Sequence, residues 1–382
     1  MRDRSWWIRA VTPPIAVGAV IAVSAVGLPA NASAPQLSPK TAQQVIALLA
    51  NPTVTGLSGD VVEKSALGLP ALPSGGGRST AAGLTGLLTG THSLRVWVGT
   101  AGQFRAQVLD TLDETEVVSD GTTLWTYVYS TNSVSRVTLP AQGKASTSKP
   151  SPAEASLTPD QAATKVLSAI DPSTEVTVSG TASIAGHDAY LLDVRPRTAD
   201  TTIGVIRIGV DATTGVALRV QIFARGATSA ALTIGFTHVS FGAVDASRFQ
   251  FTPPPGATNT TGGPNIVAGP RHGSDKPSTA PVPESASSTQ PRVVGTGWTS
   301  VVVLPNGALT TSMPGQSQAA DRHDSGPNLA DLVAKAGTRV TGGTLLRTAL
   351  INVLVADDGR VLVGAVPASV LQKALTAPAQ TG

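Results

Sequence analysis

A strict period-two alternation in residues 114–139 constrains the fold more than any other feature of the chain. Two alternating runs flank Asp120-Gly121, a dipeptide that favours the positive φ angles of a tight hairpin turn. The second run places Trp125, Tyr127 and Tyr129 at alternate positions, which predicts a strand with three aromatic rings on one face. The chain has five Trp, three Tyr and six Phe among 382 residues, so this face concentrates a scarce residue type.

Alternating segments of the same kind surround the hairpin and predict a mainly antiparallel α+β unit. Five short strands between residues 93 and 139 predict a meander. A first helix at 39–50 is expected to begin with Ser38 as N-cap, and a second helix at 158–170 opens with a Thr-x-x-Gln capping box. The other expected strands are 57–67, 175–179, 181–184, 189–195, 202–211, 217–224 and 230–241.

Composition divides the chain into four regions. Residues 1–34 have the features of a signal peptide or an N-terminal membrane segment, and residues 35–256 hold the elements of one large domain. Residues 257–294 are rich in Thr, Gly, Ser and Pro and are expected to be a linker without a core. Residues 295–382 are expected to form a small α+β unit. Its expected elements are a strand at 298–304, a helix at 328–336, a hairpin of 345–355 and 360–365, and a helix at 367–375.

The N-terminal region predicts an extracytoplasmic protein. Three Arg residues precede an apolar stretch at 15–28, which is followed by small-residue cleavage patterns. The stretch is shorter than the roughly 20 residues of a spanning helix, which favours a cleaved signal peptide, with cleavage expected after Ala32. An uncut segment would instead tether the protein to the membrane. The sequence contains no Cys, which excludes disulfides, thiolate metal sites and a lipid-modified cysteine.

Three segments resemble the LolA and RseB superfamily. Residues 119–127 match its recurring DG-x-x-LW-x-Y pattern, and 185–194 and 248–256 are similar to pieces of secreted LolA-like proteins of high-GC bacteria. The resemblance covers about residues 38–256. It implies a strongly curved antiparallel sheet, a half-open β-barrel with covering helices, that binds acyl chains of a lipid or lipoprotein in a hydrophobic cavity.

Aromatic residues are the candidates for the lining of that cavity, although alternation alone leaves open which face of the sheet is concave. Each ring has the alternative role of packing in the core between sheet and helices. The candidate lipid-binding residues are Trp97, Phe104, Trp125, Tyr127, Tyr129, Phe223 and Phe236.

The resulting interpretation is a non-catalytic extracytoplasmic carrier. One alternative is an RseB-like envelope-stress regulator that binds an anti-sigma factor, because a large domain, a linker and a smaller sheet unit also resemble RseB. Another is a structural envelope protein without a cavity. The partners expected are lipid or lipoprotein acyl chains and a membrane protein such as an anti-sigma factor or a transporter.

Other chemistry finds little support in the sequence. Residues 323–327 contain His, Asp and Ser in a row, which cannot adopt the geometry of a hydrolase triad. The five His residues lack metal-ligand spacing, and acidic residues at 110–120 lack the spacing of a calcium loop, so a solvated hairpin tip is favoured. A formal net charge of +3 without a basic stripe argues against nucleic acid. We therefore expect no cofactor, no metal and no catalysis.

Overall fold

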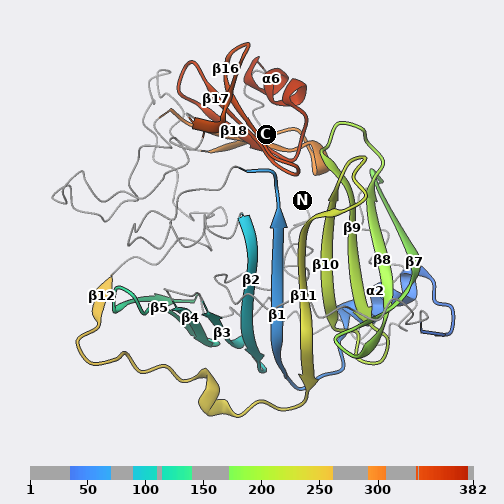
Figure 1. Ribbon diagram of the computed structural model, residues 1–382, viewed down its shortest axis with the longest axis vertical. Helices are drawn as coiled ribbons and strands as arrows, with labels where there is room; N and C mark the ends of the chain where they lie inside the picture. The colour runs from blue at the N-terminus through green and yellow to red at the C-terminus, as the bar shows by residue number, and fades with distance from the viewer. Residues whose placement is uncertain are drawn as a thin grey trace, which may run out of the picture.

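The computed structural model describes residues 35–69, 89–109, 114–139, 172–260, 291–306, 333 and 335–376. These residues form one large and one small β-sheet, accompanied by helices α2 (Ala42–Ala50) and α6 (Ala368–Thr376) (Figure 1). The α+β class expected from the sequence is confirmed.

Within the described ranges, the large sheet has 12 strands in the order β12-β6-β5-β4-β3-β2-β1-β11-β10-β9-β8-β7. All neighbours pair antiparallel except β12 and β6, which are parallel. The strands are β1 (Leu57–Ala66), β2 (Thr89–Val98), β3 (Gln103–Leu109), β4 (Glu114–Asp120), β5 (Thr123–Val128), β6 (Ser133–Thr138), β7 (Thr174–Ile184), β8 (His187–Pro196), β9 (Ile203–Asp211), β10 (Ala217–Ala224), β11 (Ala230–Phe241) and β12 (Thr258–Thr260).

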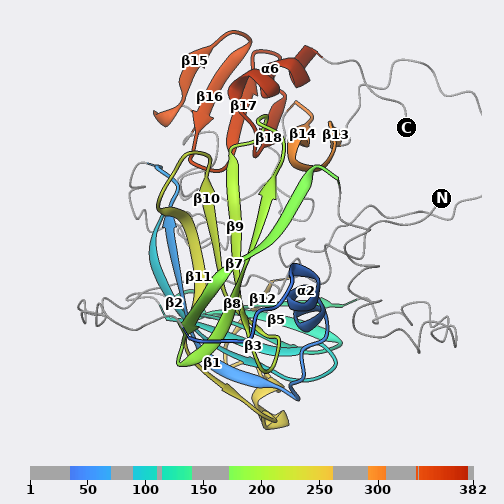
Figure 2. The same ribbon diagram turned by 90° about the vertical axis from the view of Figure 1, so that its right-hand side faces the viewer.

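The large sheet is strongly curved and does not close. Strands β1, β11 and β7–β10 stand upright, whereas β3–β5 turn away from them toward the side on which α2 lies (Figures 1 and 2). We call the face of the sheet that carries α2 the inner face and the opposite one the outer face. The curved, half-open antiparallel sheet that the family resemblance implies is thus present.

Helix α2 covers the inner face at β7, β8 and β9. Val45 and Ile46 are buried against Tyr190, Leu192 and other residues of these strands. The helix starts later than the sequence predicts, because its N-cap is Thr41 and not Ser38. Thr41 Oγ1 accepts a hydrogen bond from the Gln44 N–H, while Gln44 Oε1 accepts one from the Thr41 N–H. This capping box satisfies helix-end donors that Ser38 would leave unpaired.

The turn at Asp120-Gly121 forms as predicted. Gly121 has a φ of 95°, and its Cα lies so close to the Ala101 carbonyl that a Cβ would be 2.4 Å from the oxygen. Asp120 Oδ1 accepts hydrogen bonds from the backbone N–H groups of Thr122 and Thr123, each at 2.8 Å. The side chain therefore fixes the turn that sets the register of β4 against β5.

We call strands β2–β5 the arm of the large sheet. After β11 the chain crosses the outer face of this arm as an extended segment, residues 245–257, which we call the strap (Figure 1). A short 3-10 helix, η1 (Ala246–Phe249), opens it, with Asp245 as N-cap. Phe249 is 1% exposed and lies against Gly99, where a Cβ would approach its ring to 2.7 Å. Arg105 Nη1 donates to the Arg248 carbonyl at 3.1 Å. The strap is thus anchored by one buried ring and one charge-assisted hydrogen bond.

The small sheet has the order β13-β14-β18-β17-β16-β15. Its strands are β13 (Arg292–Val294), β14 (Val301–Leu304), β15 (Thr338–Val340), β16 (Gly343–Arg347), β17 (Asn352–Ala356) and β18 (Val361–Gly364), with a 3-10 helix η2 (Gly297–Thr299) before β14. Helix α6 packs on this sheet and buries Leu371 and Ala374.

The small sheet docks on the upper end of the large one. Leu350 is buried with Ile203 and Ala231 of the large sheet. Backbone hydrogen bonds cross the contact from the Thr202 N–H to the Ala365 carbonyl at 2.9 Å and from the Ala349 N–H to the Leu67 carbonyl at 2.8 Å. A shared apolar cluster with paired backbone groups makes this a packed interface and not a loose tether.

Three strand predictions differ from the structure. Segments 175–179 and 181–184 form the single strand β7, because a bulge before Gly180 lets pairing with β8 continue. Segment 345–355 is two strands, β16 and β17, because Thr348 Oγ1 accepts from the Ile351 N–H and closes a turn. Residues 298–300 belong to η2 and its C-cap, so β14 starts at Val301.

Two short strands, β12 and β13, lie within the segment expected to be a linker, and the four domain boundaries remain a proposal. The N-terminal region 1–34, the helix expected at 158–170 and the motif at 323–327 lie outside the described residues.

We predict that Phe249→Ala destabilises the protein by about 3–5 kcal/mol, because it removes a buried ring and leaves a cavity under the strap. Urea unfolding monitored by circular dichroism measures the change. Tyr129→Ala is the control, because the Tyr129 ring is 43% exposed and its loss should cost far less. Equal costs for the two variants would contradict the anchoring role of Phe249.

Candidate functional site

The inner face of the large sheet is the candidate site, and the strand register defines which residues belong to it. Residues paired directly across antiparallel strands have side chains on the same face. Val220 packs in the cluster around α2 and pairs with Ile234. Phe236, on the same face of β11 as Ile234, pairs with Val61, which pairs with Leu94. The face that carries α2 therefore continues onto β1 and β2.

The same face continues across the turned arm. Leu94 pairs with Val108, and Val98 with Phe104. Ala106 pairs with Val117. Val61, Leu94 and Val108 form a buried cluster with Phe236 and Ile234 packed against it. Apolar side chains thus lie on the inner face from the α2 end of the sheet to β3, and β4 adds Val117 between Thr115 and Ser119.

Several apolar side chains of this face are only half-buried. A half-buried apolar surface inside a curved sheet differs from a filled core, because its side chains still have area available for a ligand. The half-buried inner-face residues are Val96, Phe104, Leu124, Val137, Ile234 and Phe236.

An acid and an imidazole interrupt the apolar inner face. Glu63 of β1 pairs across the strands with His92 of β2 on one side and Ile234 of β11 on the other. Glu63 is 4% and His92 8% exposed. Glu63 Oε2 lies 3.9 Å from His92 Nε2, too far for a hydrogen bond, and has no hydrogen-bond partner among the described residues.

Burial raises the pKa of Glu63 from 4.5 to about 7, and the charge of His92 opposes this shift. The cause is the loss of hydration of the carboxylate among apolar neighbours. Because the folded-state pKa is raised, the neutral form is favoured in the folded protein. The contribution of the protonated Glu63 carboxyl to folding stability is fully present below pH 4.5 and is lost as the pH rises through about 7.

The sequence analysis did not single out this pair. The sequence does show that Glu63 is two positions after Val61, so that it lies on the same face of the strand as this apolar residue. Alternation within one strand does not show that His92, 29 positions later in the chain, lies beside Glu63. That contact follows from the register of β1 against β2.

The seven candidate lining residues lie on two faces and do not form one surface. Phe104 and Phe236 lie on the inner face. Trp97, Trp125, Tyr127 and Phe223 lie on the outer face by the same register, and Tyr129 joins them through its ring contact with Tyr127 at 4.4 Å.

The aromatic face of the 114–139 hairpin is covered by the strap. The Phe251 ring lies 6.2 Å from that of Trp125 and 6.0 Å from that of Tyr127. The Arg248 guanidinium lies 5.5 Å from the Trp97 ring centre. These rings therefore pack between strand and strap, the core-packing alternative that the sequence left open.

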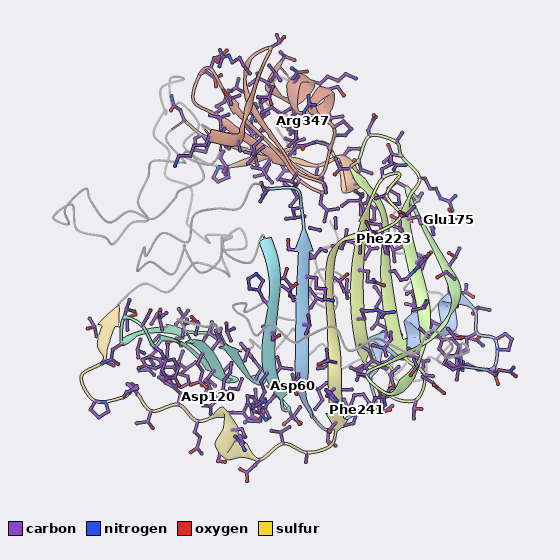
Figure 3. All side chains as sticks on the ribbon, in the orientation of Figure 1. Asp60, Asp120, Glu175, Phe223, Phe241 and Arg347 are labelled. Carbon is purple, nitrogen blue, oxygen red and sulfur yellow. The ribbon has the colours of Figure 1, made fainter. Side chains whose placement is uncertain are left out.

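Phe223 belongs to a separate polar region of the outer face. Its ring lies 5.6 Å from the Arg207 guanidinium, and it is labelled on β10 in Figure 3. Arg207 donates two hydrogen bonds, of 2.7 and 2.9 Å, to the buried Asp193 carboxylate. Although burial opposes ionisation, these bonds and the Arg charges lower the pKa of Asp193, so this ion pair persists at neutral pH.

Other titratable groups in the described part of the chain do not converge on a catalytic or metal site. No group of three metal-ligating side chains occurs there. His187 Nδ1 lies 3.5 Å from Asp211 Oδ2, but Asp211 also accepts hydrogen bonds from the Thr213 and Thr214 N–H groups and so fixes a turn. No helix of the described residues is long and apolar enough to cross a membrane.

We predict that the wild-type protein loses folding stability between pH 5 and pH 8 and that Glu63→Gln abolishes this loss. The wild-type protein should lose up to roughly 3 kcal/mol over this range, because the buried carboxyl must ionise. Thermal unfolding at several pH values measures it. Asp60→Asn is the matched control, since Asp60 lies on the same strand but is exposed and paired with Arg95. A Glu63→Gln profile parallel to the wild type would contradict the assignment.

Comparisons with known proteins gave no match to a family model and none to a curated protein. Solved structures did match. Pseudomonas aeruginosa MucB, in its complex with MucA, is 14% identical over 87% of this chain and 94% of that chain, with a TM-score of 0.38. A LolA superfamily protein from Nitrosomonas europaea is 10% identical over 56% and 99%, with a TM-score of 0.23. An uncharacterized conserved protein from Thermus thermophilus is 10% identical over 58% and 98%, with a TM-score of 0.34. At these scores we base the function on the geometry of the inner face.

Proposed function

We propose that this protein is a non-catalytic extracytoplasmic carrier that holds acyl chains of a lipid or lipoprotein on the inner face of its curved sheet. The observation that carries the proposal is the set of half-buried apolar side chains that the register places on the inner face of β11, β2, β3, β5 and β6.

The physical reason is the cost of exposing an acyl chain to water. Each methylene exposed costs about 0.8 kcal/mol, so a chain leaves a membrane only for a surface of comparable apolar area. Phe104 and Phe236 are the aromatic members of this surface and are the residues that we propose to contact the chain.

The curvature supports the same function. Because β3–β5 turn toward the side that carries α2 (Figure 2), apolar residues from distant strands face a common volume. An acyl chain there would contact side chains from several strands at once, which a flat sheet would not allow. Recognition would depend on apolar area and not on specific hydrogen bonds.

The first measurement is native mass spectrometry of the protein purified from its own cell envelope without detergent, followed by lipid extraction. A stoichiometric acylated adduct is expected. A protein that carries no adduct and takes up neither added phospholipid nor lipopeptide would exclude the carrier function.

We predict that Phe104→Asp weakens uptake of an acylated fluorescent probe by at least about tenfold, because it places a charge on the apolar inner wall. Trp125→Asp is the matched control. Both rings are half-buried on the same arm, Phe104 on β3 and Trp125 on β5, but Trp125 lies on the outer face. Circular dichroism verifies folding, and Phe104→Ser replaces Phe104→Asp if the latter does not fold. Loss of uptake only in Trp125→Asp would place the lipid on the outer face.

A second candidate function is regulation by binding an anti-sigma factor, and an exposed apolar edge of the small sheet favours it. Val293 of β13 is 62% and its cross-strand neighbour Val302 39% exposed, and β13 is an edge strand with unpaired backbone groups. We predict that Val293→Lys abolishes capture of an anti-sigma factor's outer domain while acyl-chain uptake is unchanged. Uptake of lipid without capture of any such domain would exclude this function.

A further inference from the structure

A half-buried cation on the outer face has no counter-charge in the described part of the chain. Arg219 lies in the middle of β10 and makes no ion pair or hydrogen bond with a described residue. Burial lowers its pKa, and the charge of Arg207 lowers it further. No acidic group of the described residues contributes. Taking a guanidinium out of water without a partner is unfavourable, so the site is electrostatically incomplete.

Two glycines determine where the Arg219 side chain lies. Arg219 pairs with Gly209 of β9 and with Gly235 of β11. A Cβ at Gly235 would lie 2.8 Å from Arg219 Cγ and 3.1 Å from Arg219 Cβ. The side chain therefore lies along the sheet over Gly235, in space that a larger residue would occupy.

The neighbouring positions on this face add positive charge. One row runs across the strands as Asp193, Arg207, Gln221, Thr233 and Lys64. Asp193 is the acid of this row, and it is already bound by Arg207 and by Arg195.

The next acid along β1 is also engaged. Asp60 is bound by Arg95 at 3.0 Å and is labelled on β1 in Figure 3. Asp193 and Asp60 therefore have Arg partners of their own, and Asp211, two residues after the Arg219 partner Gly209 on the same face of β9, accepts hydrogen bonds from the Thr213 and Thr214 N–H groups. No carboxylate of the described residues pairs with Arg219.

We propose that Arg219, together with Lys64, forms an outer-face binding site for a phosphate oxyanion, which either a lipid headgroup or free phosphate supplies. The planar guanidinium offers paired N–H donors that match two phosphate oxygens. Gln221 and Thr233 provide uncharged hydrogen-bonding groups in the adjacent row. The site lies on the face opposite the acyl-binding surface and does not depend on the proposed function.

The test uses the full-length protein and the variant Arg219→Met. Titration calorimetry with inorganic phosphate, against chloride at the same ionic strength, should show phosphate binding that Arg219→Met weakens by about tenfold or more, the loss expected for charge-assisted hydrogen bonds. In phosphate-free buffer Arg219→Met should unfold at a higher temperature than the wild type, because a cation without a partner is removed.

Arg95→Met is the matched control, because it removes one cation from the same face but one that Asp60 already neutralises. It should leave phosphate affinity unchanged. Arg219→Lys keeps the charge but loses the paired donors, and should bind with intermediate affinity. If Arg219→Met does not fold, Arg219→Lys replaces it in the test.

Flotation with vesicles distinguishes the two sources of phosphate. Arg219-dependent binding to phosphatidylglycerol vesicles without binding of inorganic phosphate would assign the site to a lipid headgroup, and the reverse would assign it to free phosphate. Binding of neither by the wild type, or equal losses in Arg219→Met and Arg95→Met, would overturn the proposal.

Discussion

The pairing of β1 with β11 is the contact on which the rest of the structure depends. It joins a strand at residues 57–66 to one at 230–241, while the other edge of β1 pairs with β2. Without it, the β2–β6 meander and the β7–β11 meander would be two separate sheets with exposed edges. With it, one apolar face runs from α2 to the turned arm. The bulge at Asp60/Val61 lies in this pairing and adds to the local twist.

A single register also explains why the two faces have different chemistry. On the inner face it aligns Val61, Leu94 and Val108, and among them Glu63 with His92. On the outer face it pairs Asp193 with Arg207 and places Arg219 in the next row of the same face, opposite Gly209. Apolar side chains and cationic side chains therefore lie on opposite faces of the same sheet.

Both the strap and the docked small sheet cover parts of the large sheet that would otherwise be exposed to solvent. Phe251 covers the rings of β5 and Phe249 is buried against Gly99, while Leu350 covers the upper end near Ile203. Both contacts join residues far apart in the sequence. Forming them costs conformational entropy, which the burial of apolar side chains offsets only once the contact is made. Both follow β11 in the chain, so they depend on a large sheet that is already formed.

The sequence by itself determined most strands of the large sheet, the Asp120-Gly121 turn and the grouping of Trp125, Tyr127 and Tyr129 on one face, because alternation and turn chemistry are local. It also indicated the α+β class and a curved sheet through the family resemblance. Only the tertiary structure decided that this aromatic face is the outer one, since parity does not distinguish concave from convex and the covering strap lies more than 100 residues away. The Glu63–His92 pair and the isolated Arg219 likewise depend on which strands lie side by side, which is a long-range choice that no local pattern encodes.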